Sequence, residues 1–158
     1  MQKRRPLHGS ISDNIYEITS KEIIKVDDFL NAMKRISEDY LRGSVSLDIS
    51  GNGGGITDIS VSITAKIIKL MLKTAAPGIL KIDINTDSDL KITLTPAELP
   101  PVRDLAMIMT FAKSAGFKTD RDERSVTFTS KITVTHVLSV YAVSCDDIYE
   151  EMREFFAS

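Results

Sequence analysis

The sequence contains little of what several classes of protein require. Among its 158 residues there are one cysteine and two histidines, and the net charge at pH 7 is −2. A single cysteine cannot build an internal disulfide framework, which small exported domains commonly use. A near-neutral chain lacks the clustered basic face of nucleic-acid-binding proteins, and no apolar run reaches the roughly 18 residues of a transmembrane helix. We therefore expect no nucleic acid and no membrane among its partners.

The N-terminal segment MQKRRPLHGS is basic, but the apolar stretch of a signal peptide does not follow it. We therefore expect the protein in the cytoplasm. Residues 1–14 are rich in polar and turn-forming residues, which predicts a flexible tail. For Lys3, Arg4 and Arg5, a solvated part of this tail and a contact with an anionic partner both stay open. The first is favoured because chain termini are usually loose.

The rest of the chain has the composition of a globular domain, 42% hydrophobic and 27% charged. We expect residues 15–158 to form one such domain. Apolar residues recur with helical spacing in some segments and alternate with polar residues in others. Helices are expected over residues 27–43, 58–78, 102–116 and 145–158, and strands over 44–50, 79–85, 89–95 and 124–142. Residues 15–26 could add one or two short strands.

Each expected helix and each expected strand has one apolar face that must be covered. An α+β fold covers all of them as a two-layer α/β sandwich, with the helices on one face of a mixed, mostly antiparallel sheet. The last segment, 124–142, is too long for a single strand. We therefore expect a bend or a hairpin near Ser130–Thr133.

A glycine-rich segment, SGNGGGITD, connects the strand over 44–50 to the helix over 58–78. A loop in this position can bind phosphate through its backbone N–H groups. The candidate anion-binding residues are Gly51, Gly53, Gly54 and Gly55. The segment has no lysine or arginine, and Ile56 stands where the dinucleotide-binding pattern requires a glycine. A flexible joint between two elements is therefore favoured, with an anion site as the alternative.

The order of helix, strand, long helix, hairpin, helix and strands resembles the ATP-binding domain of sensor histidine kinases and their relatives, the Bergerat-fold ATPases. Two stretches carry the resemblance further. IIKLMLKTAAPGILKIDI (67–84) is similar to the family's long helix and the strand after it. DLAMIMTFAKSAGFKTDRDERSVTFTSKI (104–132) is similar to its last helix and strand. The resemblance covers roughly residues 27–135 and leaves 136–158 as a C-terminal extension.

The resemblance also implies what this chain lacks. The family's long helix carries an asparagine that holds Mg²⁺ against the ATP phosphates, and the matching residue here is Leu70. The family's hairpin ends in a motif whose aspartate pairs with adenine, whereas this one ends in LTPAELPP without a glycine. Too few residues follow for an ATP lid. The resemblance therefore implies a degenerate member that hydrolyses no ATP and has no cofactor.

A second alignment places Asn31, in FLNAMKRIS (29–37), at the Mg²⁺ position. It matches GNGGGI (51–56) to a nucleotide-binding glycine motif of the family. This alignment is disfavoured because the family has two strands between these motifs. The residues from Gly43 to Ser50 suffice for only one strand.

No set of side chains in the sequence forms a convincing catalytic or metal site. His8 falls in the tail, and His136 falls on the apolar phase of a strand. That phase favours a core or interface residue over a base or a metal ligand. Cys145 is followed by two aspartates and has no identifiable histidine partner, so a nucleophile is disfavoured. The mixed-charge run over residues 120–124 is typical of a solvated turn.

The expected function is that of a non-catalytic binding or regulatory module that acts through contacts with a protein partner. Two other classes stay open: a nucleotide- or anion-binding protein that uses the Gly51–Gly55 loop, and an enzyme of unrecognised type with a carboxylate such as Asp48 near that loop. A homodimer is a further hypothesis, because apolar residues of the C-terminal extension need a cover from the domain or from a second copy. They are Tyr141, Ile148, Met152, Phe155 and Phe156.

Overall fold

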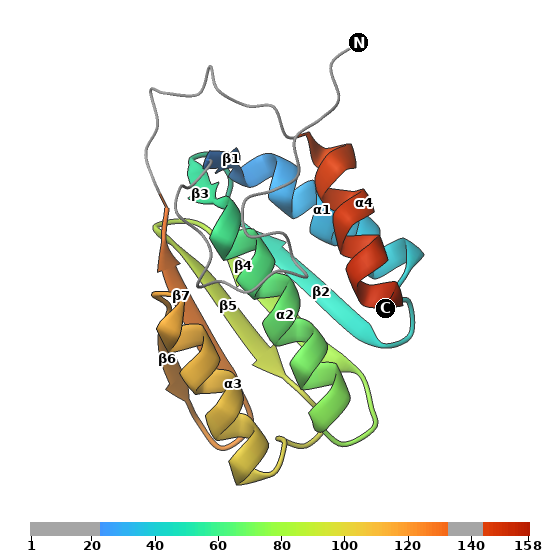
Figure 1. Ribbon diagram of the computed structural model, residues 1–158, viewed down its shortest axis with the longest axis vertical. Coiled ribbons are helices and arrows are strands. Elements are labelled where there is room, and N and C mark those ends of the chain that lie inside the picture. Colours follow the sequence, from blue (N-terminus) through green and yellow to red (C-terminus); the bar gives the residue numbers. More distant parts are fainter. Residues whose placement is uncertain (1–22, 133–143) are drawn as a thin grey trace.

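The computed structural model describes residues 23–132 and 144–158. In these residues a five-stranded sheet carries all four helices on one of its sides (Figure 1). A short two-stranded ribbon lies at one end. The expected α+β fold, a two-layer sandwich with its helices on one face of the sheet, is therefore confirmed.

The helices follow one another along the chain as the sequence patterns predict, and two short strands, Gly55–Thr57 and Lys118–Arg121, are added to the expected ones. The helices are α1 (Val26–Asp39), α2 (Asp58–Thr74), α3 (Val102–Ser114) and α4 (Cys145–Ala157). The strands are β1 (Ile23–Lys25), β2 (Val45–Ser50), β3 (Gly55–Thr57), β4 (Leu80–Asn85), β5 (Asp89–Thr95), β6 (Lys118–Arg121) and β7 (Val126–Lys131). Among the described residues, no helix is both long enough and apolar enough to cross a membrane.

The sheet has the strand order β2-β4-β5-β7-β6. Strands β2 and β4 are parallel, and α2 makes the crossover between them. The other three pairs are antiparallel. The sheet is thus mixed and mostly antiparallel, as expected, and its two free edges are β2 and β6.

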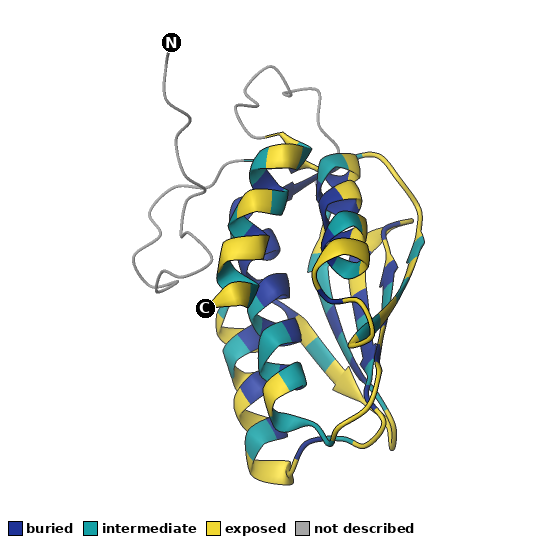
Figure 2. Ribbon diagram, turned by 90° about the vertical axis from the view of Figure 1, so that its right-hand side faces the viewer, coloured by how far each residue is buried: buried dark blue, intermediate teal, exposed yellow. Residues whose placement is uncertain are grey.

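The core lies between the sheet and the helices, where Figure 2 shows the buried residues. Alternate residues of the central strands point into it, which is why the apolar positions of these strands recur every second residue. Leu90, Ile92 and Leu94 of β5 and Phe128 of β7 are fully buried there. The alternating pattern in the sequence therefore reports burial on one face of the sheet.

The last described hairpin contains a strand, β6, that the sequence pattern does not predict. Strand β7 ends at Lys131, within the range Ser130–Thr133 where a bend or hairpin is expected, and it pairs with β6, which comes earlier in the chain. The turn between them is fixed by Asp122, whose carboxylate accepts hydrogen bonds from the backbone N–H groups of Arg124 and Ser125 at 2.7 and 2.8 Å. These bonds lower the pKa of Asp122. Residues 133–142 of the expected strand lie outside the described residues.

The mixed-charge run 120–124 is therefore only partly a turn, since Asp120 and Arg121 belong to β6. At the other end of the chain, β1 supplies one of the short strands expected within 15–26 and pairs antiparallel with β3. Residues 15–22 and the expected tail, 1–14, lie outside the described residues.

Candidate functional site

The glycine segment connects the end of β2 to β3, which pairs with β1. Gly51, Gly53 and Gly54 have φ angles of 90°, 77° and 79°, a left-handed conformation that favours glycine. Gly55 was expected in the loop, but it belongs to β3. It is buried in β3, where it pairs with Lys25 of β1. The candidate anion loop is therefore residues 51–54.

The loop is attached to neighbouring elements at both of its ends. At its start, the carbonyl of Ser50 accepts hydrogen bonds from the backbone N–H of Thr86, at 2.9 Å, and from its hydroxyl, at 3.3 Å. At its end, the carbonyl of Gly54 accepts a hydrogen bond from the N–H of Val26 at 3.0 Å. These contacts fix the loop against the β4–β5 turn and the start of α1, as a structural joint requires.

One N–H group of the loop and two in the first turn of α2 are already bonded to oxygens of the chain. The N–H of Gly53 donates to the Asp27 carboxylate at 3.1 Å. In the first turn of α2, the N–H of Ile59 donates to the carboxylate of Asp58, and the N–H of Ser60 donates to the hydroxyl of Thr57. An added anion would have to displace these oxygens and approach two carboxylates, which repel it.

Leu70 lies on α2 and is half-buried against the hydrophobic core. Its side chain has no atom that can coordinate a cation. The next segment that the resemblance assigns to nucleotide binding follows β5, where Pro96 and Pro100 are buried and Leu99 packs against the core. Apolar packing therefore occupies both positions to which the resemblance assigns metal- and nucleotide-binding groups. Among the described residues, no three His, Cys, Asp or Glu side chains come together as a metal site would need.

Asn31, the candidate of the second alignment, is exposed on α1. The strand that follows α1 is β2, which pairs with β4 in parallel rather than in a hairpin. Strand β3 pairs with β1 instead of β2. The second alignment needs two strands side by side at this point, and the described sheet does not provide them.

A groove of about 1140 Å³ lies between α1 and β2. Half-buried Val45, Leu47 and Ile49 of β2 form its apolar floor. Polar side chains of α1 form its rim, among them Asn31 and Lys34. Because β2 is an edge strand, the groove runs along a free edge of the sheet.

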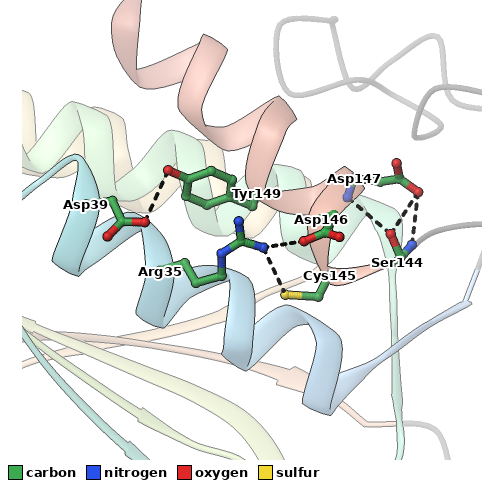
Figure 3. Close-up of polar contacts among 7 residues, drawn as sticks. All are labelled: Arg35, Asp39, Ser144, Cys145, Asp146, Asp147 and Tyr149. Atoms are coloured by element: carbon green, nitrogen blue, oxygen red, sulfur yellow. Dashed lines mark hydrogen bonds and ion pairs between the residues drawn. The ribbon is translucent and has the colours of Figure 1, made fainter.

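A second cluster joins α1 to the C-terminal helix α4 (Figure 3). The Arg35 guanidinium forms an ion pair with Asp146, lies 3.9 Å from the sulfur of Cys145, and stacks over the Tyr149 ring with 4.1 Å between its central carbon and the ring centroid. The Tyr149 hydroxyl donates to Asp39 at 3.4 Å. Beneath these contacts Ile148 and Met152 are fully buried. Helix α4, the described part of the extension, therefore packs as part of the fold.

The far end of α4 is held by α2. Lys69 donates to the carbonyls of Phe155 and Ser158 at 2.8 and 3.0 Å. Its ammonium group also lies 4.4 Å from the centroid of the Phe155 ring. A cation at the C-terminal end of a helix satisfies its last carbonyls and opposes its dipole. The pKa of Lys69 is lowered mainly by desolvation and, to a smaller extent, by repulsion from the positive charge of Lys73.

This packing changes the grounds for self-association through the extension. Of its apolar residues, Ile148 and Met152 are covered by the domain itself, and Phe155 and Phe156 are half-buried against it. Tyr141 lies outside the described residues. Self-association stays a prediction, but these side chains no longer require it.

The remaining sequence candidates do not come together. Cys145 is half-buried beside Arg35. Asp48 is exposed, and its register in β2 places it on the sheet face away from the helices, opposite Asp83 of β4. His8, His136 and the basic residues 3–5 lie outside the described residues.

Sequence reasoning missed the role of Arg35 and of the α1–α4 contact. Arg35 and Asp146 are 111 positions apart in the sequence, and no local pattern links them. One signal was available: Ser144 and Asp147 form a reciprocal capping box that marks the start of α4.

No family model matches the sequence, and no curated protein matches it either. Among solved structures, the chain is similar to the cytoplasmic segment of the histidine kinase QseC, with 10% identity and a TM-score of 0.45 over 78% of this chain and 83% of that one. It is also similar to a bacterial phosphotransferase (13% identity, TM-score 0.46, 68% of this chain and 63% of that one). A third similar structure is the histidine kinase AdeS of Acinetobacter baumannii (14% identity, TM-score 0.44, over 74% of this chain and 68% of that one). At these identities and scores, no activity of those proteins passes to this chain.

Proposed function

We propose that this chain is a non-catalytic binding module on a histidine-kinase-type ATPase fold, and that it acts through protein contacts rather than through ATP. The observation that carries the proposal is the bonding of the glycine loop. The Gly53 N–H, one of the loop groups that a phosphate could use, is bonded to Asp27, and the loop has no lysine or arginine that could bind a phosphate in its place.

The order of elements supports the fold assignment. The first helix (α1), the long helix (α2), the β4–β5 hairpin, α3 and the β6–β7 hairpin follow one another as the resemblance implies. Leu70 lies on the long helix at the position that the resemblance gives to the Mg²⁺-holding asparagine. Its packing against the core supports conversion of a ligand site into core.

The energies support the same conclusion. With no lysine or arginine in the loop, a phosphate would gain backbone N–H contacts and the α2 dipole, which is worth about 0.3–1 kcal/mol when exposed. A micromolar dissociation constant corresponds to about −8 kcal/mol. The described loop offers no group that could supply the difference.

Two other functions remain as alternatives to be tested. A nucleotide- or anion-binding protein would use residues Gly51–Gly55, and it would have to displace Asp27 from the loop. An enzyme of another type would need a cluster of reactive side chains near that loop, and Asp48 lies apart from it on the outer face of the sheet. We favour the binding module because it requires no rearrangement of these contacts.

Thermal unfolding in the presence of Mg²⁺ and ATP tests the proposal. A ligand at 100 times its dissociation constant stabilises a protein by about 2.7 kcal/mol, which corresponds to a rise in Tm of about 5–11 °C for a chain of this length. We expect no such rise with millimolar Mg²⁺-ATP. Inorganic tripolyphosphate in a parallel sample distinguishes anion binding from nucleotide binding.

The matched control is the double variant Gly53→Ala/Gly54→Ala. If Mg²⁺-ATP raised the Tm of the wild type by several degrees, and the variant lost that rise, the loop would be a phosphate site and the proposal would be wrong. A rise that survived in the variant would also contradict it, and would place the nucleotide elsewhere on the fold.

A further inference from the structure

The two free edges of the sheet differ in length and in charge. Strand β6 has four residues, and three of them are charged, namely Lys118, Asp120 and Arg121. Short, charged edge strands resist pairing with other chains. Strand β2 has six residues and one charge, Asp48. Its edge therefore lacks the protection that β6 has.

The inner face of β2 is also incompletely covered. Val45, Leu47 and Ile49 are half-buried, whereas Leu80, Ile82 and Ile84, which lie opposite them on β4, are buried. The difference arises from the groove of about 1140 Å³ that separates β2 from α1. Beyond Val45, which forms an isolated bridge with Arg42, the apolar strip of Leu47 and Ile49 is left open to a further strand.

The backbone of β2 is oriented for such a strand. The carbonyls of Ser44 and Ser50 point at β4, where they accept hydrogen bonds from Leu80 and Thr86 at 2.9 Å. Because successive residues of a strand point their backbone groups to opposite sides, those of Val45, Leu47 and Ile49 point to the free edge. The N–H of Val45 donates to the carbonyl of Leu41, and Arg42 forms an isolated bridge with Val45, so the free part of the edge begins after Val45. The outward groups of Leu47 and Ile49 bond to no other backbone group of the described chain.

The sequence of the strand suggests its partner. Residues 44–50, SVSLDIS, are nearly symmetric about Leu47. In an antiparallel pair of two copies centred on Leu47, Val45 faces Ile49 and Ser46 faces Asp48. Branched apolar residues then meet one another on the inner face, and the one charge of the strand faces a hydroxyl instead of its own copy. Such cross-strand pairs stabilise a sheet, and opposed like charges would destabilise it.

We propose that the occupant of the β2 edge is a second copy of this chain. The two β2 strands pair antiparallel about a two-fold axis at Leu47 and join the two sheets into one. An isologous contact needs a surface that is complementary to itself, and the symmetric strand meets that requirement. The rim of the groove carries both signs of charge, Lys34 and Arg42 against Glu38, as an interface between two copies needs.

This inference deepens the proposed function by naming one protein partner, and it rests on that proposal only for the idea that the chain works through protein contacts. Its failure and the failure of the proposed function are distinguishable. Nucleotide binding is read from Tm with Mg²⁺-ATP, whereas dimer formation is read from mass and from cross-linking.

The test has two parts. Sedimentation of the wild-type chain over about 1 µM to 1 mM, the span of weak to moderate affinities, should show a monomer–dimer equilibrium. In a Cys145→Ser background, Leu47→Cys should then form an intermolecular disulfide under mild oxidation. The Cα atoms of a hydrogen-bonded antiparallel pair lie about 5.5 Å apart, within the roughly 4.4–6.8 Å that a disulfide spans.

Ser46→Cys in the same background is the control. In this register residue 46 faces residue 48 of the other copy, so two copies of residue 46 lie more than about 7 Å apart and should not cross-link efficiently. A chain that is monomeric at every concentration overturns the proposal. So does a dimer in which Ser46→Cys cross-links as fast as Leu47→Cys, because its interface or register is then another one.

Discussion

A chain that ends at Ser144 is expected to lose about 3–6 kcal/mol of its free energy of unfolding. The loss comes from Ile148 and Met152, which are fully buried, because burial of an apolar side chain of this size contributes about 1.5–3 kcal/mol. Natural domains have roughly 5–15 kcal/mol in total. The truncation should therefore lower the denaturant midpoint sharply or leave the chain unfolded at 25 °C.

Single variants keep this prediction measurable if the truncated chain does not fold. Met152→Ala should cost about 2–5 kcal/mol as a core truncation. Arg153→Ala removes an exposed ion pair with Glu150 on the same helix and should stay within about 0.5 kcal/mol of the wild type. Urea unfolding measures all three chains. Equal midpoints for the truncated and full-length chains would contradict the packing of α4 on α1.

The variant Gly51→Ala is expected to destabilise the protein by about 2–5 kcal/mol. The left-handed conformation of Gly51, with φ at 90°, costs a residue with a side chain about 1–2 kcal/mol. The added methyl group would also lie 2.6 Å from the Thr86 hydroxyl and 2.9 Å from the N–H of Asp87. Relief of such overpacking commonly costs about 1–3 kcal/mol more.

Gly53→Ala separates the two contributions. Its φ is 77°, but a methyl group added there meets no atom within 4 Å. It should cost only the conformational term, about 1–2 kcal/mol. Both variants are compared by urea unfolding at the same pH. If Gly51→Ala cost no more than Gly53→Ala, the loop would not be held against the β4–β5 turn as described.

The central strands were predictable because burial imposes a period of two on their sequence. Leu80, Ile82 and Ile84 show it, and so do the inner residues of β5. Strand β6 was not predictable in the same way. Three of its four residues are charged, since it lies at an edge where side chains reach water, and its sequence therefore looks like a turn.

The glycine loop was predictable as a loop, but its bonding was not. The contact of Gly53 with Asp27 joins residues that are 26 positions apart. The restriction on Gly51 comes from the β4–β5 turn, which is also distant in sequence. Neither partner belongs to a local motif, so composition alone could not decide between a joint and an anion site.

The groove along β2 also depends on tertiary structure. The alternation of Val45, Leu47 and Ile49 predicted a strand with one apolar face, as for β4. That β2 lies at the edge of the sheet, with α1 set apart from it, follows only from the strand order. The near symmetry of residues 44–50 about Leu47 is visible in the sequence, but only the strand order shows that this symmetric strand lies at an edge.

The most direct test of the central claim is an NMR titration of the ¹⁵N-labelled chain with Mg²⁺-ATP. The amide signals of Gly53 and Gly54 report on the loop, and the signal of Leu70 reports on α2. We predict that none of these signals shifts in a saturable way up to millimolar ligand. A dissociation constant of about 1 mM corresponds to a binding free energy of about −4 kcal/mol. Saturable shifts of the Gly53 and Gly54 amides at micromolar ATP would show that the Asp27 carboxylate gives way to phosphate, and would contradict the account.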